Sequence, residues 1–300
     1  MENSSIAIGV DVGGSHFCSA AVDIVSGEMA GTPVVTPVDS RADASVILDA
    51  LVSNITDTVK ASGAASVKGV GLAFPGPFDY VHGISTVEGV DKYEKIFGLD
   101  VASSLRQRLS SAGIDRFRFL NDAAAFALGE CFGGAAKGAD RVVGITLGTG
   151  VGSGFVAGHR LVESGDEVPA YGWVYHLSFE GGIADEAFST RWICRRYHEL
   201  TGQTVSGAKE VVDQYDQRQE ARDLFSEYGK RFADFMAPVL MKFRADMLVL
   251  GGNISRAWDL FSKEFTDGLR GHGCCTEIRI SELRDKAAII GAASLFVETE

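Results

Sequence analysis

Two stretches of this sequence match each other at a constant offset of 135 residues. Residues 8 to 15 read IGVDVGGS and residues 143 to 150 read VGITLGTG, so that Gly9 falls on Gly144 and Gly13 falls on Gly148. Because an internal repeat is the sequence sign of a duplicated structural unit, the match predicts two related domains, each opening with a strand, a glycine turn and a strand. A chance match between two strands rich in glycine and valine stays open as the alternative.

Length, charge and cysteine spacing narrow the class of protein further. A chain of 300 residues with 46% hydrophobic residues can bury a large core, and its length favours two domains. The net charge of −12 argues against nucleic acid and anionic lipid as partners. We find neither a signal-peptide pattern nor a run long enough to span a membrane, so we expect a cytoplasmic protein without a membrane partner. Five cysteines without Cys-x-x-Cys spacing predict free thiols.

Strand-like runs and amphipathic helices alternate in two successive sets, which predicts an α/β fold. In the first set, residues 6 to 24 read as strand, glycine turn and strand, and residues 67 to 76 read as a buried strand ended by proline and glycine. The second set opens with FRFLND at residue 117 and contains another buried strand in DMLVLGGN, residues 246 to 253.

The glycine turns of the two sets suit phosphate binding. Glycine lets the backbone approach an oxyanion closely and aim several N–H groups at it. Neither G-x-x-x-x-G-K-[ST] nor G-x-G-x-x-G occurs in the sequence, so any phosphate would be held by hairpin turns and not by a helix N-terminus. If the two turns face each other across a cleft, both would offer N–H groups to it.

Asn121 and Asp122 stand where an apolar alternation ends and an alanine-rich helical run begins. Both residue types are favoured at helix N-caps, so one hypothesis is that they only cap the helix. The other hypothesis is catalytic, because an enzyme that phosphorylates a hydroxyl needs a carboxylate to accept the hydroxyl proton.

Five segments of the chain occur in the order and spacing of the phosphate 1, sugar, catalytic, phosphate 2 and adenosine segments of the ROK family of sugar kinases. They are IGVDVGGS, GLAFPGPFD, FLNDAAAF, GITLGTGVGSGF and LVLGGN, and the chain resembles that family over almost its whole length. The resemblance implies the duplicated ribonuclease-H-like (actin-like ATPase) fold, with two domains flanking a cleft. It places a smaller domain at residues 1–118 and a larger one at 119–285, with a C-terminal helix, 286–300, packed back on the first.

The same resemblance implies an ATP-dependent kinase with Mg²⁺ as cofactor and a hexose or hexose derivative as substrate. Asp122 is the implied general base, and Asp11 is implied to orient Mg²⁺ through water. The implied sugar-binding residues are Gly76, Asn121, Asp122, Trp173, His176 and Asp185. The implied nucleotide-binding residues are Asp11, Gly13, Gly14, Ser15, Gly148, Thr149, Gly150, Gly251 and Gly252.

The sequence departs from the family pattern at several positions. His16 stands where relatives often carry lysine, and Trp173 stands where they carry the glutamate of Glu-x-Gly-His. The cysteines of the family's zinc segment are missing, so we expect no zinc site. An indole stacks on the apolar face of a sugar ring and does not accept hydrogen bonds from hydroxyls, so glucose, fructose, N-acetylated hexosamines and other hexoses stay open as substrates.

Two other functions compete with the kinase. The family also contains sugar-responsive repressors with an N-terminal helix-turn-helix, whereas here the first core strand is expected from Ile6. A non-catalytic sugar- and nucleotide-binding sensor stays open because Trp173 alters the sugar site. Asp11, Asp122 and both glycine turns favour the kinase. The oligomeric state is left open, with a homodimer among the alternatives.

Overall fold

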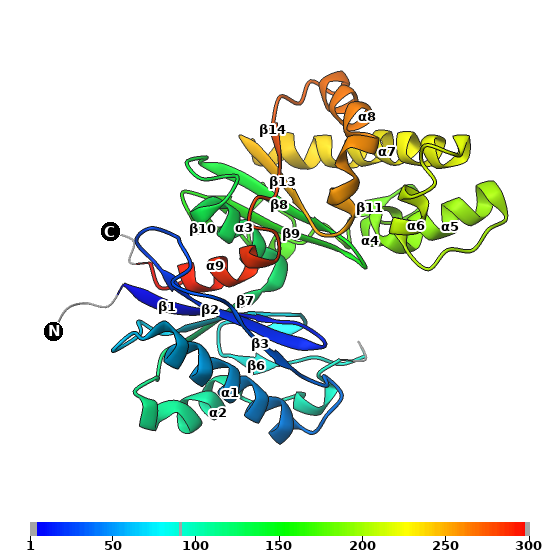
Figure 1. Ribbon diagram of the computed structural model, residues 1–300. Helices are drawn as coiled ribbons and strands as arrows, with labels where there is room; N and C mark the ends of the chain where they lie inside the picture. Colours follow the sequence, from blue (N-terminus) through cyan, green and yellow to red (C-terminus); the bar gives the residue numbers. More distant parts are fainter. Residues whose placement is uncertain (1–4, 90–91, 298–300) are drawn as a thin grey trace. The chain divides into compact units, whose positions relative to one another are not determined.

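A computed structural model describes residues 5–89 and 92–297 of the chain. The chain divides into two compact units: unit 1 comprises Met1–Gly134 and Asp285–Glu300, and unit 2 comprises Ala135–Arg284 (Figure 1). Within the described residues, no helix combines the length and apolar character that crossing a membrane requires. All five cysteines are free thiols, as the sequence predicts.

Unit 1 is built on a five-stranded sheet in the order β3-β2-β1-β4-β7. Its first three strands are antiparallel, and β4 and β7 are added in parallel. The strands of this sheet are β1 (Ile6–Val12), β2 (His16–Asp23), β3 (Val34–Pro37), β4 (Val70–Phe74) and β7 (Phe117–Asn121), and a separate hairpin pairs β5 (Phe78–Asp79) with β6 (Ile84–Ser85). The helices are α1 (Ala44–Ser62), α2 (Val101–Leu109), α3 (Asp122–Gly133) and α9 (Ala287–Ser294), with 3₁₀ turns at Glu94–Ile96 and Ser110–Ala112.

Unit 2 repeats this plan with the order β10-β9-β8-β13-β14. The sheet comprises β8 (Arg141–Leu147), β9 (Val151–Ala157), β10 (Arg160–Leu161), β13 (Met247–Gly251) and β14 (Glu277–Ile280), and a second hairpin pairs β11 (Ser178–Phe179) with β12 (Gly182–Ile183). The helices are α4 (Ala184–Phe188), α5 (Thr190–Thr201), α6 (Ala208–Val212), α7 (Gln219–Phe243) and α8 (Trp258–Gly271), with 3₁₀ turns at Ala170–Gly172 and Ile254–Ala257. A further 3₁₀ turn, Arg284–Lys286, spans the point where the chain returns to unit 1.

The two sheets share one connectivity, in which the first strand lies between the second and the fourth. Gly9 of β1 pairs with Ala20 of β2, and Gly144 of β8 pairs with Gly154 of β9, so the offset between the repeats falls from 135 to 134 after the turn. The second hairpin turn is therefore one residue shorter than the first. The first hairpin turn closes with the Gly13 N–H donating to His16 O (3.1 Å), and the second with the Gly148 N–H donating to Gly150 O (3.0 Å). The predicted α/β fold of two related ribonuclease-H-like units is therefore confirmed.

The division between the units differs from the boundary that the sequence predicts near residue 118. β7 forms a parallel ladder with β4, from Val70 opposite Phe117 to Phe74 opposite Asn121, and therefore belongs to the first sheet. α3 follows it and packs on α9, so unit 1 extends to Gly134. Residues 1–4 of the expected first domain and 298–300 of the expected C-terminal helix lie outside the described residues.

The sheet of unit 1 has a different cover on each face (Figure 1). Alternate residues of β1, Ile8 and Val10, join the apolar core formed with α1 and α2. Gly9 points the other way, where a Cβ would lie 1.9 Å from Ile289 O of α9, and a Cβ on Gly71 of β4 would lie 1.9 Å from Ala292 O. The backbone of α9 therefore rests directly on the sheet, which only glycine permits at these two positions.

The backbones of α9 and α3 are equally close to each other. A Cβ on Gly129 of α3 would lie 2.0 Å from Ala287 O, and a Cβ on Gly291 of α9 would lie 1.8 Å from Ala125 O. These two glycines bring the helix backbones together, so the start of α3, which carries Asp122, is held by a rigid neighbour.

Candidate functional site

The junction of β7 and α3 separates the roles of Asn121 and Asp122. Asn121 is the N-cap of α3, and its side-chain oxygen accepts hydrogen bonds from the N–H groups of Ala123 (3.0 Å) and Ala124 (3.4 Å). Asp122 is the first residue of the helix, and its Oδ1 accepts from the Ala123 N–H (2.9 Å). The capping hypothesis thus applies to Asn121, and the carboxylate of Asp122 is not needed as the N-cap.

The carboxylate of Asp122 is accessible to solvent but densely surrounded by protein. Desolvation raises the pKa of Asp122, while hydrogen bonds from the backbone and from Asn121, and the positive charge of Lys92, act in the opposite direction. A carboxyl group with a raised pKa at a solvent-accessible position is a candidate proton acceptor.

Asp11 in β1 is the second carboxylate of unit 1 with a raised pKa. Burial, followed by the negative charges of Asp122 and Asp285, raises the pKa of Asp11 to about 7. Asp285 lies near the start of α9, and its proximity to Asp11 cannot be predicted from the sequence, because the fold alone brings residues 11 and 285 together.

A pH-dependence follows from the raised pKa of Asp11. An ordinary aspartate has a pKa of about 3.9. Between about pH 4 and pH 7 the folded protein therefore holds a proton that the unfolded chain has released, and Asp11 lowers the free energy of unfolding as the pH rises through this window. We expect Asp11→Asn, which has no carboxyl proton to lose, to unfold at a higher temperature than the parent at about pH 8. Its unfolding midpoint should also change less than that of the parent between about pH 5 and pH 8.

Thermal unfolding of both proteins in the presence of a chelator measures this effect. An equal change in midpoint between the two pH values for parent and variant would contradict the assignment of a raised pKa to Asp11.

Gly76, Tyr80 and Asn121 lie together in unit 1. The Asn121 side-chain amide donates to the Tyr80 hydroxyl (3.3 Å), and that hydroxyl donates to Phe74 O (3.1 Å). A Cβ on Gly76 would lie 3.1 Å from the same hydroxyl. Tyr80 was not predicted, although an aromatic residue shortly after the FPGPFD segment was a signal in the sequence.

The first glycine turn lies beside a cavity of about 420 Å³ within unit 1. The side chain of Lys92 runs along Gly14, where a Cβ would lie 3.1 Å from Cε and 3.2 Å from Nζ. Ser15 Oγ and His16 Nδ1 share a hydrogen bond of 3.0 Å. The residues that line the cavity are Gly14, Ser15, Val38, Asp39, Ser40, Arg41 and Lys92.

The second glycine turn, in unit 2, is fixed by the residues around the start of α5. Gly148 O accepts from both the N–H and the hydroxyl of Thr190 (2.8 and 2.9 Å), and Thr149 O accepts from the guanidinium of Arg191 (2.9 Å). Oδ1 of Asp185 accepts from the Val151 N–H (2.8 Å), and its other oxygen forms an ion pair with Arg191.

Asp185 was expected among the sugar ligands, and the structure places its carboxylate against this turn. Both carboxylate oxygens have partners there, and a Cβ on Gly150 would lie 2.8 Å from Oδ1. The side chain therefore positions the backbone that was predicted to bind phosphate. Arg191 was not predicted.

Gly251 is the last residue of β13 in the same unit, and Gly252 follows it. Gly252 has φ of +80°, and a Cβ on it would lie 2.3 Å from Leu147 O, at the end of β8. This position requires glycine for its backbone conformation and for close approach to the strand that leads into the second turn.

Trp173 is flanked by other aromatic rings on the loop of residues 171 to 176. Its indole lies 4.8 Å from the Tyr171 ring and 6.0 Å from the Tyr175 ring, and Tyr175 lies 5.2 Å from the His176 ring. Tyr171 and Tyr175 are 64% and 41% exposed. Neither tyrosine was predicted. Both extend the indole into a solvent-exposed aromatic surface suited to the apolar faces of sugar rings.

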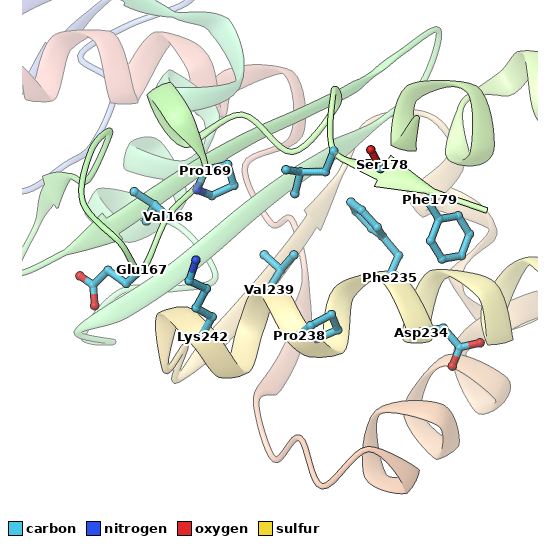
Figure 2. A pocket seen from close by; sticks show the side chains of 11 residues that line it. Glu167, Val168, Pro169, Ser178, Phe179, Asp234, Phe235, Pro238, Val239 and Lys242 are labelled. Carbon is cyan, nitrogen blue, oxygen red and sulfur yellow. The ribbon is translucent and has the colours of Figure 1, made fainter. Parts of the chain in front are cut away.

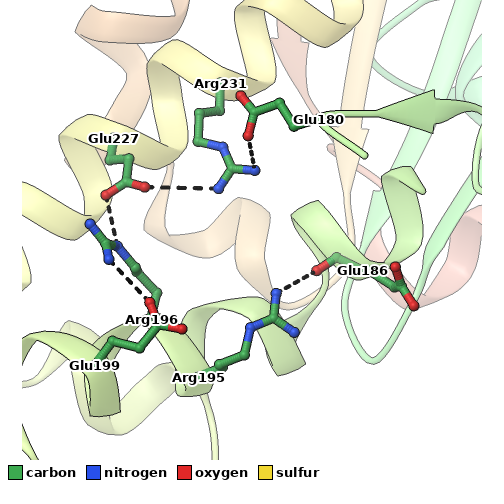
Figure 3. Close-up of polar contacts among 7 residues, drawn as sticks. All are labelled: Glu180, Glu186, Arg195, Arg196, Glu199, Glu227 and Arg231. Carbon is green, nitrogen blue, oxygen red and sulfur yellow. Dashed lines mark hydrogen bonds and ion pairs between the residues drawn. The ribbon is translucent and has the colours of Figure 1, made fainter. Parts of the chain in front are cut away.

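The β11–β12 hairpin follows this loop and is held by ion pairs (Figure 3) and by ring contacts. Glu180 at its tip pairs with Arg231 of α7 (2.7 Å), and the guanidinium of Arg231 also lies over the rings of Trp192 (4.8 Å) and Phe179 (5.5 Å). Glu227, on the same helix, pairs with Arg196 of α5 (2.9 Å).

Among the described residues, no group of three or more His, Cys, Asp or Glu side chains could hold a metal ion. That the protein binds no zinc stays a prediction.

Unit 2 also contains a cavity, of about 370 Å³, between α7 and the β11–β12 hairpin (Figure 2). Phe235 and Val239 of α7 point into it, opposite Pro169 and Phe179, and Glu167 and Lys242 lie at one end. None of the predicted site residues lines this cavity.

Comparison with known proteins gives matches along nearly the whole chain. A model of the protein family described as the ROK family matches residues 7–299. A glucokinase of Thermotoga maritima is 27% identical, with 97% of each chain covered. An N-acetyl-D-glucosamine kinase of Haemophilus influenzae is 25% identical, with 96% of this chain and 98% of the relative covered.

Among solved structures, a ROK family glucokinase from Streptomyces griseus in complex with glucose and AMPPNP superposes with a TM-score of 0.72. It is 24% identical and covers 97% of this chain, and the chain covers 98% of it. At this level of identity the likeness supports the fold, and the duplicated connectivity described above agrees with it.

Proposed function

Because the chain belongs to the ROK family, we propose that it is an ATP-dependent sugar kinase in which Asp122 accepts the proton of the sugar hydroxyl. The observation that carries the proposal is that Asn121 and Asp122 have different roles at the start of α3. Asn121 caps the helix, and the neighbouring carboxylate of Asp122 is accessible to solvent with a raised pKa. Removal of the hydroxyl proton in the transition state needs such a base.

The sugar would be oriented by polar groups near this base. The Asn121 amide donates to Tyr80, which in turn donates to Phe74 O, so both side chains have fixed orientations. Gly76 leaves space beside them, because a side chain there would meet the Tyr80 hydroxyl. Fixed donors and acceptors decide which hydroxyl reaches the base, and this positioning is a large part of catalysis in phosphoryl transfer.

The phosphates would be held by the glycine turns of residues 13–15 and 148–150. Thr190, Arg191 and Asp185 hold the second turn through its carbonyl oxygens and the Val151 N–H, which fixes the direction of its backbone. A preorganised backbone binds an oxyanion without first losing conformational freedom.

The carboxylate of Asp11 fits a role in Mg²⁺ binding. It is half-buried and close to two other acids, an arrangement that a divalent cation would stabilise by offsetting the negative charge. Mg²⁺ is commonly bound through one or two carboxylates, several waters and the substrate phosphates, so the protein need not supply a full set of ligands. When bound, it neutralises the charge that develops on the phosphate oxygens. Asp11 would orient it through water.

The aromatic surface of Tyr171, Trp173 and Tyr175 supports a hexose or a hexose derivative as the substrate. Such rings pack against the apolar face of a sugar, and the relatives named above are kinases of glucose and of N-acetyl-D-glucosamine. His176 is exposed beside Tyr175 and could bond a sugar hydroxyl.

A coupled assay of ADP release over hexoses, hexosamines and their N-acetyl forms tests the activity. We expect at least one sugar to raise ADP release well above the rate with Mg²⁺ and ATP alone, because a kinase transfers phosphate faster to its bound substrate than to water. Omission of Mg²⁺ is the matched control and should abolish the increase. If no sugar in the panel raises ADP release, the non-catalytic sensor becomes the better hypothesis.

The remaining expectations stay predictions for this chain. They are a cytoplasmic location and the absence of a nucleic-acid or membrane partner. The oligomeric state stays open, with a homodimer among the alternatives.

A further inference from the structure

Lys92, from a distant segment of unit 1, lies along the first glycine turn, and it belongs to no phosphate-binding motif in the sequence. The Cδ, Cε and Nζ atoms of Lys92 all lie 3.1 to 3.2 Å from the position that a Cβ on Gly14 would occupy. The side chain thus extends along the turn, and with Gly14 and Ser15 it lines the cavity of about 420 Å³. Glycine at position 14 is what leaves room for it.

Tyr93, the next residue, anchors this lysine. The Tyr93 side chain is fully buried, its ring lies 5.6 Å from that of Phe74, and its hydroxyl donates a hydrogen bond to Gly13 O. Its backbone is in the left-handed region, with φ of 58°. Tyr93 therefore ties the segment that carries Lys92 to the glycine turn itself.

The charge of Lys92 also acts on the catalytic carboxylate. It lowers the pKa of Asp122, against the larger effect of desolvation. An ammonium group that lies along the phosphate turn and also acts on the base is suited to the terminal phosphates, whose charge must be neutralised during transfer.

We propose that Lys92 binds the terminal phosphates of the nucleoside triphosphate, and that it supplies the positive charge which His16 does not provide at this turn. This inference rests on the proposed kinase function. Lys92 has no ion-pair partner within the described residues, so its ammonium can bind phosphate without breaking an existing salt bridge. The alternative is a solvated surface lysine, which would make no difference to nucleotide binding.

Replacing Lys92 with methionine tests the proposal, because methionine keeps an unbranched side chain and removes the charge. Titration calorimetry with Mg²⁺ and AMPPNP measures binding without turnover. We expect the dissociation constant of the variant to rise by about 10- to 100-fold, the range for loss of a charge-assisted hydrogen bond. Lys92→Arg should stay within about threefold of the parent, because arginine keeps the charge and binds phosphate.

Lys95→Met is the matched control. It removes an exposed lysine from the same segment and should leave binding unchanged. Thermal unfolding should give the same midpoint for all four proteins. Equal affinity of Lys92→Met and the parent for AMPPNP would overturn the inference, as would equal losses in Lys92→Met and Lys95→Met.

The outcome separates this inference from the proposed function. If the parent binds AMPPNP and Lys92→Met binds it weakly, the role of Lys92 is supported even if no sugar is phosphorylated. If the parent releases ADP with a sugar and Lys92→Met has an unchanged KM for ATP and unchanged kcat, the kinase stands and the role of Lys92 falls. A parent that binds no AMPPNP overturns both.

Discussion

Replacement of Asp122 by asparagine should lower kcat by about 10²-fold or more, equivalent to roughly 3 kcal/mol in the activation barrier. The amide has the shape of the carboxylate and can still accept the Ala123 hydrogen bond, but it cannot take the proton of the sugar hydroxyl. Sugar affinity should change far less than kcat. The folded protein should be about as stable as the parent, because Asn121, which caps α3, is untouched.

Asp100→Asn provides a matched control within the same unit. Asp100 is the N-cap of α2 and accepts a hydrogen bond from the Ser103 N–H (2.8 Å), and asparagine caps helices about as well as aspartate. The control therefore removes a carboxylate from a helix start without touching the proposed site, and turnover should stay close to that of the parent. Near-normal kcat of folded Asp122→Asn protein on its best sugar would remove Asp122 from the mechanism.

Replacement of Gly291 by alanine should destabilise unit 1 severely. The new methyl group would lie 1.8 Å from Ala125 O and 2.8 Å from Gly129 N, and both atoms belong to the backbone of α3. Overpacking of a core usually costs about 1–3 kcal/mol, and here no flexible side chain can move aside, so we expect a cost at or above the upper end. A loss of this size is a large part of a typical stability of about 5–15 kcal/mol.

Circular dichroism during thermal unfolding measures the effect, together with the yield of soluble protein. The control is Gly271→Ala at the end of α8, where a Cβ would meet no atom within 4 Å. Alanine favours helix over glycine by about 1 kcal/mol in helix interiors, so the control should be neutral or slightly stabilised. Unfolding of Gly291→Ala at the temperature of the parent would contradict the close contact between α3 and α9.

The sequence predicts the fold where its signals are local. The glycine turns after Val12 and Leu147 are marked by glycine and by apolar alternation, and the repeat relates one to the other. The unit boundary is a different case, because the apolar residues of FRFLN predict a strand without indicating its neighbour. Pairing of β7 with β4 is a long-range contact, and the structure was needed to assign that strand to unit 1.

The candidate site shows the same difference between local signals, which the sequence carries, and long-range contacts, which depend on the fold. The position of Asp122 between a strand and a helix can be read from the sequence, but backbone geometry decides that its neighbour Asn121 is the cap. Lys92 carries no motif, and it reaches Gly14 because the burial of Tyr93 brings a distant segment to the turn. Asp185 is a candidate sugar ligand through the resemblance to the family, and only the structure shows its carboxylate bound at the second turn. Spacing identifies candidate residues, whereas their contacts depend on tertiary packing.

The discontinuity of unit 1 has a consequence for the order of events during protein synthesis. The ribosome completes residues 135–284, the whole of unit 2, before it makes α9. Domains usually begin to fold while the chain is still being made, and unit 2 can do so from a complete sequence. Unit 1 cannot be completed at that stage, because the face of the first sheet that carries Gly9 and Gly71 lacks α9 until residues 287–294 emerge. The unit whose synthesis begins first is therefore the last to be completely folded. Until α9 is made, the strand backbone around Gly9 and Gly71 is accessible to other nascent chains and to chaperones.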